Sequence, residues 1–329
     1  MLDKFGLSRR SLLAGASLIA AGEITGRVRP ALAKGVLPPA QAPAFYRFQI
    51  GDIDAAIVSD GELSLGPART DMFNGISQDL IDTTLTDNFL SSQNLVLQEN
   101  ALLLNSGGKL VLFDVGSGTS KAFGPNAGRI AENLKTLGVA RGDIDAIVLT
   151  HAHPDHCWGL VADDGSLNFP NAQIFVSEAD YNFWTDEAKI SQPFIGDFIP
   201  PTRKQLVPNR ERITFIKDGA EIVPGVVAMF APGHTVGHTI FMVTSGSKTL
   251  CVTADLAHHH LLTLANPKVE FGFDTDRKQG AATRIRVFDT LVANRTPMLA
   301  YHFPWPGIGH LVKQGDGYRF IAVPQQTVL

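Results

Sequence analysis

The sequence is poor in cysteine, with only Cys157 and Cys251 among its 329 residues. Two cysteines allow at most one disulfide bond, which excludes a fold that depends on a disulfide framework. The pair can form that one bond or remain as two buried thiols. We favour the thiols, because a free cysteine packs as a small apolar side chain.

Basic residues are in deficit once the N-terminal region is set aside. The chain has 28 Lys and Arg against 32 Asp and Glu, and residues 1–33 hold five of the basic and two of the acidic residues. The remainder therefore has 28 − 5 = 23 basic and 32 − 2 = 30 acidic residues, a net charge of −7. An acidic surface disfavours nucleic acid as a partner.

Long hydrophobic runs are also missing, because no segment has the roughly 20 apolar residues needed to span a bilayer. The short apolar stretch near the N-terminus follows Arg9 and Arg10, and the small-x-small sequence Ala31-Leu32-Ala33 comes after it. We predict that residues 1–33 are a twin-arginine (Tat) signal peptide, with a membrane anchor as the less favoured alternative. The mature protein would then work in the periplasm or outside the cell.

After a Pro- and Ala-rich extended lead-in at residues 34–45, strand-like and helix-like segments alternate without a clear linker. Hydrophobic patterns and turn residues predict strands at 45–59 with a turn at 51–52, 100–105, 109–114, 144–149, 172–176, 213–216, 226–230, 240–243, 249–252 and, as the last strand, 297–301. Helical spacing predicts helices at 128–137, 178–188 and 281–293. We therefore predict one α/β domain over residues 46–329, with a core of two sheets flanked by helices.

A cluster of His and Asp residues directly follows the predicted strand at 144–149. His151, His153, Asp155 and His156 place three imidazoles and one carboxylate within six positions. Imidazole nitrogen and carboxylate oxygen are ligands that suit zinc and neighbouring metals. A surface loop rich in His by accident is the alternative, but the additional carboxylate favours a metal site.

Three further candidate ligands follow strand ends elsewhere in the chain. His234 comes after the strand at 226–230, Asp255 after the strand at 249–252, and His302 after the strand at 297–301. Together with the cluster, five His and two Asp would therefore arrive from four strand ends. Such an arrangement is typical of a metal site built on several strand ends.

The order of these seven residues resembles the metallo-β-lactamase superfamily, and the resemblance covers nearly all of the chain after residue 45. It implies an αββα sandwich of two mixed β-sheets flanked by helices, with the site at the edge of the sheets. It also implies that one metal is held by His151, His153 and His234, and a second by Asp155, His156 and His302. Asp255 would bridge the two metals, and Asp114 would support the site without ligating.

The resemblance further implies a dinuclear hydrolase with two divalent ions per chain. Zinc is our first choice, with Mn²⁺, Co²⁺ or Fe²⁺ as alternatives. Two such ions share a water whose pKa falls toward neutrality, so that a bridging hydroxide serves as the nucleophile. We expect Asp255, His302 and Asp155 to be essential to catalysis.

Within the superfamily, the chain more closely resembles the methyl parathion hydrolase group and its lactonase relatives. This likeness rests on the long N-terminal region before the first strand pair, on Phe123-Gly124-Pro125 and on the segment 302–310. Glyoxalase II, a thioester hydrolase, adds a helical C-terminal domain, whereas only 27 residues follow His302 here. We therefore expect lactones or aryl esters as substrates, with organophosphate triesters as the alternative. A thioester hydrolase and a mononuclear iron enzyme that handles sulfur compounds are less favoured.

The substrate should be neutral or weakly charged and partly apolar, because aromatic residues are available to form its pocket. The candidate pocket residues are Phe123, Trp184, Phe194, Phe198, His258, Phe271 and Phe273. Of the run His258-His259-His260, we expect His258 to face the pocket. His238 and His310 are expected to orient ligands or fix loops. Members of the group are commonly homodimers, and we expect a homodimer here.

Overall fold

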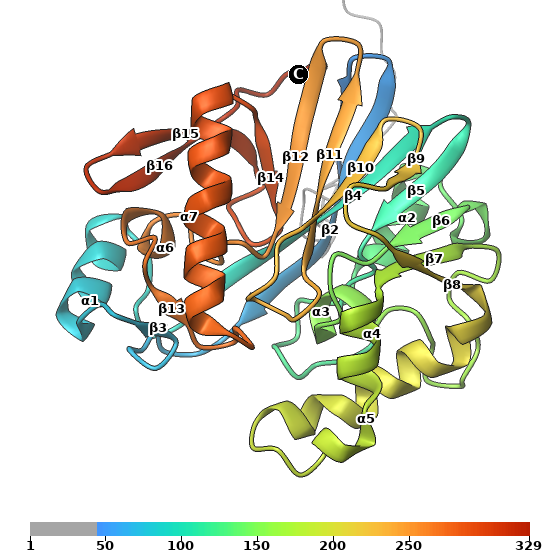
Figure 1. Ribbon diagram of the computed structural model, residues 1–329, viewed down its shortest axis with the longest axis horizontal. Helices are drawn as coiled ribbons and strands as arrows, with labels where there is room; N and C mark the ends of the chain where they lie inside the picture. The colour runs from blue at the N-terminus through green and yellow to red at the C-terminus, as the bar shows by residue number, and fades with distance from the viewer. Residues whose placement is uncertain (1–44) are drawn as a thin grey trace, which may run out of the picture. The chain divides into compact units, whose positions relative to one another are not determined.

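The computed structural model describes residues 45–329, which form two large mixed β-sheets with helices on their outer faces (Figure 1). The first sheet has the strand order β1-β2-β4-β5-β6-β7-β8. Its strands are β1 (Phe45–Ile50), β2 (Ile53–Ser64), β4 (Val96–Ser106), β5 (Lys109–Phe113), β6 (Ala146–Val148), β7 (Gln173–Ser177) and β8 (Ile213–Ile216). Strands β5 to β8 run parallel, whereas β1, β2, β4 and β5 form antiparallel pairs.

The second sheet has the order β16-β15-β14-β12-β11-β10-β9. Its strands are β9 (Glu221–Val223), β10 (Val226–Phe230), β11 (Thr239–Ser245), β12 (Lys248–Ala254), β14 (Met298–Ala300), β15 (Ile308–Gln314) and β16 (Gly317–Ala322). Only the β12–β14 pair is parallel. A separate two-stranded ladder joins β3 (Phe73–Asn74) to β13 (Glu270–Phe271).

The described residues also form seven α-helices. They are α1 (Gln78–Asp87), α2 (Ile130–Leu137), α3 (Pro154–Cys157), α4 (Glu178–Thr185), α5 (Ile195–Leu206), α6 (Leu262–Ala265) and α7 (Arg277–Asn294). Helix α2 ends at Gly138, which adopts the left-handed conformation that glycine tolerates best. Within residues 45–329, no helix combines the length and the hydropathy needed to cross a membrane.

Alternation along the strands produces an α/β/β/α arrangement of layers. In β4, Leu102 and Leu104 face the second sheet, whereas Ala101 and Leu103 face the helices, because successive side chains point to opposite sides of a strand. Phe113 of the first sheet meets Phe241 of the second edge to face, with ring centroids 5.3 Å apart. The middle layer of the core therefore joins the two sheets directly.

The helices close the outer faces through two further apolar layers. Leu134 of α2 and Ile199 of α5 pack on the first sheet, whereas Phe288 and Leu291 of α7 pack on the second. In Figure 1, α7 crosses in front of β14 and β15, and α4 and α5 lie beside the strands β6 to β8. These layers confirm the predicted αββα sandwich.

Most predicted elements have a counterpart in the structure, but the C-terminal prediction is wrong. The strand predicted as the last one at 297–301 is β14, and the hairpin of β15 and β16 follows it. Its turn at Gly315 and Asp316 has a glycine with positive φ. The prediction also missed α1, α3, α5 and α6, and the helix predicted to end at 188 ends at Thr185.

The remaining predictions from the N-terminal region cannot be compared with the fold. The predicted signal peptide lies outside the described residues, as does the lead-in up to residue 44, and β1 begins at Phe45.

The two cysteines are both buried free thiols, as we favoured. Cys157 packs behind the first sheet with the α2 and α5 side chains, whereas Cys251 packs beneath α7.

Candidate metal centre

The seven candidate ligands follow the carboxyl ends of strands in both sheets, five of them in loops and Asp155 and His156 in the short helix α3. His151 and its neighbours follow β6, His234 follows β10, Asp255 follows β12 and His302 follows β14. Because β12 and β14 are parallel neighbours, Asp255 and His302 leave the second sheet side by side. The site therefore forms at one edge of the sandwich, where loops from the two sheets meet.

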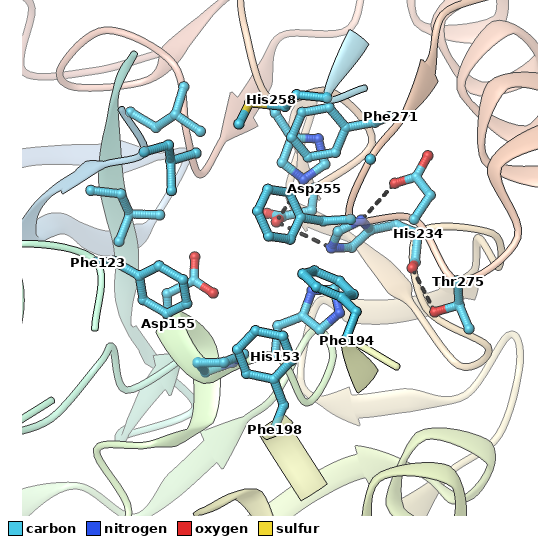
Figure 2. Close-up of a pocket in the computed structure, with 18 of the residues that line it drawn as sticks. Phe123, His153, Asp155, Phe194, Phe198, His234, Asp255, His258, Phe271 and Thr275 are labelled. Carbon is cyan, nitrogen blue, oxygen red and sulfur yellow. Dashed lines mark hydrogen bonds and ion pairs between the residues drawn. The ribbon is translucent and has the colours of Figure 1, made fainter. Parts of the chain in front are cut away.

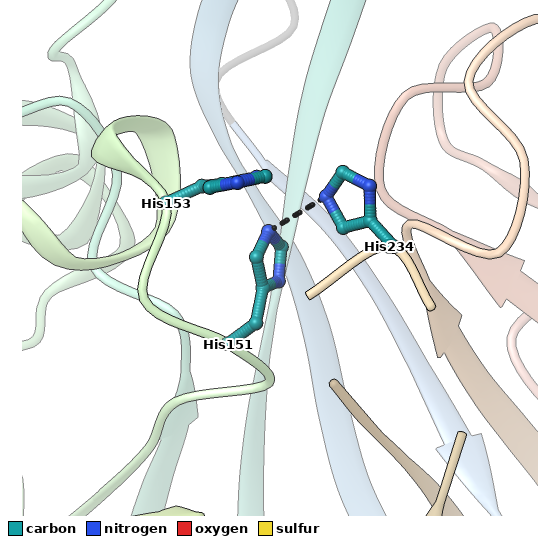
Figure 3. A group of neighbouring side chains, drawn as sticks. All are labelled: His151, His153 and His234. Atoms are coloured by element: carbon teal, nitrogen blue, oxygen red, sulfur yellow. Dashed lines mark hydrogen bonds between the residues drawn. The ribbon is translucent and has the colours of Figure 1, made fainter. Parts of the chain in front are cut away.

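Three imidazoles from two loops form the first group of ligands. His151, His153 and His234 each place one ring nitrogen within 4.8 Å of the others (Figure 3). The Nε2 atoms of His151 and His234 are 3.1 Å apart. This group matches the set predicted for one metal.

Asp155, His156, Asp255 and His302 form the second group, again with ligand atoms within 4.8 Å of one another. The Oδ2 atom of Asp255 lies 3.0 Å from Nε2 of His302 and 3.4 Å from Nε2 of His156. The same oxygen lies 3.3 Å from Nε2 of His234 and 3.8 Å from Nε2 of His151. Asp255 thus contacts imidazoles of both groups, which is the position predicted for a bridging ligand.

The other ring nitrogen is engaged in four of the five histidines, which leaves Nε2 directed into the site. Nδ1 of His151 lies 3.1 Å from the Thr150 hydroxyl, and Nδ1 of His302 lies 2.9 Å from the Gln98 carbonyl oxygen. Nδ1 of His156 lies 2.8 Å from Asp114. An oriented Nδ1 is the usual companion of a histidine that binds metal through Nε2.

Asp114 is buried at the end of β5 and has the supporting place predicted for it. Its carboxylate accepts hydrogen bonds from the backbone N–H and the hydroxyl of Thr150, both at 2.8 Å. Burial raises the pKa of this carboxyl, although the neighbouring His156 opposes the rise. Asp114 therefore connects the first residue of the ligand loop to the ring of His156.

His234 has an equivalent partner that the sequence pattern did not reveal. Its Nδ1 lies 2.8 Å from Asp274, a buried carboxylate whose other oxygen is 3.6 Å from the guanidinium of Arg284. Arg284 is 1% exposed and also donates to the carbonyl oxygens of Leu256 and Val269. This one side chain therefore fixes the loop after Asp255 and the partner of His234 together.

The carboxylates of the site favour positive charge on the groups around them. Burial opposes protonation of His234 and His302, but neighbouring carboxylates outweigh it and raise the pKa of His234 to about 9 and that of His302 to about 10. Nε2 of His156 and Oδ1 of Asp255 are buried without a hydrogen-bond partner. Unpaired polar atoms are costly to bury, and a bound cation would satisfy both. The residues therefore fit the two-metal ligand set.

A cavity of about 560 Å³ opens beside the ligands, and the structure places all seven candidate pocket residues on its wall (Figure 2). Six of their rings form a continuous series of neighbours with centroids 3.7 to 6.4 Å apart. The series is Phe123, Phe198, Phe194, Phe273, Phe271 and His258. The seventh residue, Trp184, packs against the ring of His153 at 5.0 Å.

His258 lies closest to the ligands among these pocket residues. Its ring stacks on Phe271 with centroids 3.7 Å apart, and its Nε2 is 3.2 Å from Oδ2 of Asp255. Its Nδ1 is buried and has no hydrogen-bond partner. His259 instead accepts hydrogen bonds from the backbone N–H groups of Leu261 and Leu262, so it fixes the start of α6.

The two histidines expected to orient ligands or fix loops have different places. Nε2 of His238 accepts a hydrogen bond from the backbone N–H of Asp255 at 3.2 Å, and its Nδ1 lies 3.0 Å from the Ala231 carbonyl oxygen. His238 therefore fixes the loop that carries Asp255. His310 lies on β15 and belongs to neither ligand group, so that expectation has no support.

Several charged and apolar residues that line the cavity were missed by the sequence analysis. Arg69, Asp71 and Arg277 line the cavity, and Arg69 and Asp71 form an ion pair at 3.0 Å. Leu63 and Leu97 form apolar wall on β2 and β4. No local pattern distinguishes such residues from ordinary surface or strand positions.

The fold and the ligand groups together define a metal-binding αββα protein. The chain belongs to the metallo-beta-lactamase superfamily, whose sequence pattern matches residues 95–297, or 203 of the 329 residues. The matched region includes six of the seven candidate ligands, and His302 lies just beyond it.

Two solved structures are similar to most of the chain. One is AidC, a dizinc quorum-quenching lactonase in complex with a product; it is 27% identical, with a TM-score of 0.79 over 85% of this chain and 98% of AidC. The other is the hydrolase AbOPH, which is 28% identical, with a TM-score of 0.80 over 87% of this chain and all of AbOPH.

Curated relatives are similar over a shorter region. An N-acyl homoserine lactonase from Bacillus sp is 27% identical over 192 residues, which are 58% of this chain and 65% of the relative. The Bacillus thuringiensis subsp. kurstaki lactonase AiiA is 26% identical over the same lengths. The chain thus spans about 65% of the length of the curated relatives it matches.

Zinc should stabilise the metal-free protein, because the ligands converge only in the folded state. At about a hundred times its Kd, a ligand contributes about 2.7 kcal/mol, which corresponds to a rise in Tm of about 5–10 °C for a domain of this size. Scanning calorimetry with and without Zn²⁺ measures the rise. The rise in Tm caused by zinc should become smaller as the pH falls toward 6, because protons compete with the metal for His234 and His302.

His310→Ala is the matched control, because this histidine lies outside both ligand groups and should keep the full zinc effect. His234→Ala should lose most of it. An equal rise in Tm in His234→Ala and the unaltered protein would show that zinc binds elsewhere.

Proposed function

We propose that the protein is a dinuclear metal-dependent hydrolase that opens lactones. The observation that carries this proposal is the position of Asp255, whose Oδ2 lies 3.0 to 3.8 Å from imidazole nitrogens of both ligand groups. Membership of the superfamily and the similarity to a dizinc lactonase support the proposal. The full ligand set disfavours a mononuclear iron enzyme.

In the proposed centre, His151, His153 and His234 would hold one zinc ion and Asp155, His156 and His302 the other, with Asp255 available to both. When bound, the two ions polarise the substrate carbonyl and lower the pKa of water, so that hydroxide is available near neutral pH. The protein's own contribution is to fix the ligands through their Nδ1 partners and to surround the reacting carbonyl with aromatic walls.

The cavity favours a neutral, partly apolar substrate. Phenylalanine rings form a continuous series along the wall that reaches His258 beside Asp255, and Arg69, Asp71 and Arg277 also line the cavity. The stacked pair of His258 and Phe271 offers a flat surface beside Asp255. A planar lactone or aryl ester fits such a surface better than a tetrahedral phosphotriester, which remains the alternative.

His258 is proposed to bind the substrate through Nδ1. Its buried Nδ1 lacks a partner, and leaving such an atom unpaired is unfavourable unless a bound molecule completes its hydrogen bond. The ring is held in place by Phe271 on one side and Asp255 on the other. Because the ring is neutral and its Nε2–H faces the Asp255 carboxylate, Nδ1 is an acceptor, and a hydrogen bond there would hold a donor group of the substrate beside the centre.

The substrate class is tested by comparing rates on an acyl-homoserine lactone, an aryl lactone, an aryl ester and methyl parathion with zinc-loaded protein. We expect kcat/KM for at least one lactone to exceed that for methyl parathion by tenfold or more. Asp255→Ala is the control and should lose nearly all turnover together with bound metal. Faster hydrolysis of methyl parathion than of every lactone would overturn the order of substrates.

The role of His258 is tested with His258→Phe, which keeps the stack on Phe271 but removes the hydrogen bond. We expect kcat/KM on the preferred lactone to fall about tenfold, the effect of one lost hydrogen bond. His258→Gln should recover part of the loss, and His310→Phe should leave the rate unchanged. Unaltered turnover by His258→Phe at normal zinc content would exclude this role.

Export and dimerisation are further proposals that rest on the sequence. The twin-arginine segment supports export to the periplasm or beyond, and the group resemblance supports a homodimer. Mass spectrometry of the mature N-terminus should place cleavage after Ala33, and sedimentation should give twice the chain mass. An uncleaved chain and a monomer, respectively, would contradict them.

A further inference from the structure

Asp180 is a buried carboxylate that belongs to neither ligand group and makes no contact with the cavity. It lies in the first turn of α4, and its side chain is 0% exposed. Oδ2 accepts hydrogen bonds from the backbone N–H of Ala152 at 2.8 Å and from the hydroxyl of Thr235 at 2.9 Å. Oδ1 accepts a third from the backbone N–H of Gly237 at 2.7 Å.

These three donors come from the two loops that carry the first ligand group. Ala152 lies between His151 and His153, whereas Thr235 directly follows His234. A single carboxylate on α4 therefore joins two segments that are more than 80 residues apart in the sequence, as the 83-residue separation of His151 and His234 shows.

The joint between α4 and the second of these loops is closely packed. A Cβ atom added to Gly237 would lie 2.0 Å from Oγ of Ser177 and 2.7 Å from the backbone nitrogen of Asp180. Only glycine therefore lets the loop come close enough for its N–H to reach the Asp180 carboxylate. The loop is held against the helix at a fixed position.

We propose that Asp180 is a positioning residue that sets the spacing of His151, His153 and His234 and so determines metal binding in this half of the centre. Asp114 has a comparable supporting place: it binds the ring of His156 in the second group and also Thr150, whose hydroxyl contacts Nδ1 of His151. The inference rests on the proposed dinuclear centre.

A carboxylate is needed here because all three contacts require an acceptor. Asparagine has the same shape, but its amide group would turn N–H bonds toward one of the donors. Asp180→Asn would therefore leave at least one loop without its hydrogen bond while changing little else. Losing an interaction that orients ligands typically weakens metal affinity 10- to 100-fold.

The test compares cobalt binding by Asp180→Asn and Asp114→Asn. His153→Ala and His302→Ala serve as references, because they lack a ligand of the first and second group respectively. We expect the unaltered protein to bind two Co²⁺ per chain and each Asn variant to bind its weaker ion at least tenfold less tightly. The spectrum of Asp180→Asn at one Co²⁺ per chain should match that of His153→Ala rather than that of His302→Ala.

Thr235→Val provides a milder change if Asp180→Asn does not fold, since it removes only one of the three hydrogen bonds. It should also weaken the ion of the first half without affecting the second. Unchanged binding of both ions by a folded Asp180→Asn, or weakening confined to the second half, would overturn the inference. Fewer than two ions in the unaltered protein would instead contradict the proposed centre, and lactone turnover by that protein is measured separately.

Discussion

The contact of Asp255 with imidazoles from both ligand groups is the interaction on which the rest of the site depends. Five histidines and two aspartates lie together at the edge of the sheets, most of them buried. Such a collection is unfavourable without a compensating charge, because buried polar atoms must be paired. Protons on His234 and His302 compensate the carboxylates in part, but they leave Oδ1 of Asp255 unpaired. Two cations complete the arrangement.

The sandwich serves this arrangement by bringing strand ends together. Apolar side chains between the sheets fix their separation, and the ligand loops leave β6, β10, β12 and β14 at the same edge. Three buried carboxylates then refine the position of the loops. Asp114 orients His156, Asp274 orients His234, and Asp180 joins the loops of the first group. Support of this kind is needed because ligand positions must be accurate to a fraction of an ångström.

The sequence predicted much of this site because its ligands have a distinctive order. Asp255 and His302 were recognisable because each follows an apolar strand, and strand ends determine which residues meet. Asp180 and Asp274 were not recognisable, since a helix N-terminus and a loop give no sign of the distant group they bind. Helix α5 was missed because it contains Pro200 and Pro201, which are unfavourable inside a helix. The hairpin of β15 and β16 was missed because the strand at 297–301, which leads into His302, is the last strand of the chain that the sequence pattern predicts.

The pocket could be predicted only in part from the sequence. Its aromatic residues come from five separate segments, and only the fold brings Phe123 next to Phe198 and Phe194 next to Phe273. Composition indicated an apolar substrate, but the proximity of His258 to Asp255 follows from their three-residue spacing after β12. The identity of the chemistry therefore depends on the ligand loops, whereas the choice of substrate depends on side chains gathered from across the chain.

Anomalous X-ray diffraction at the zinc absorption edge, from crystals of the zinc-loaded protein, tests the central claim most directly. We expect two zinc peaks about 3.5–4 Å apart, with Asp255 touching both, the His151 group around one and the His302 group around the other. A single peak, or zinc bound away from Asp255, would contradict the account.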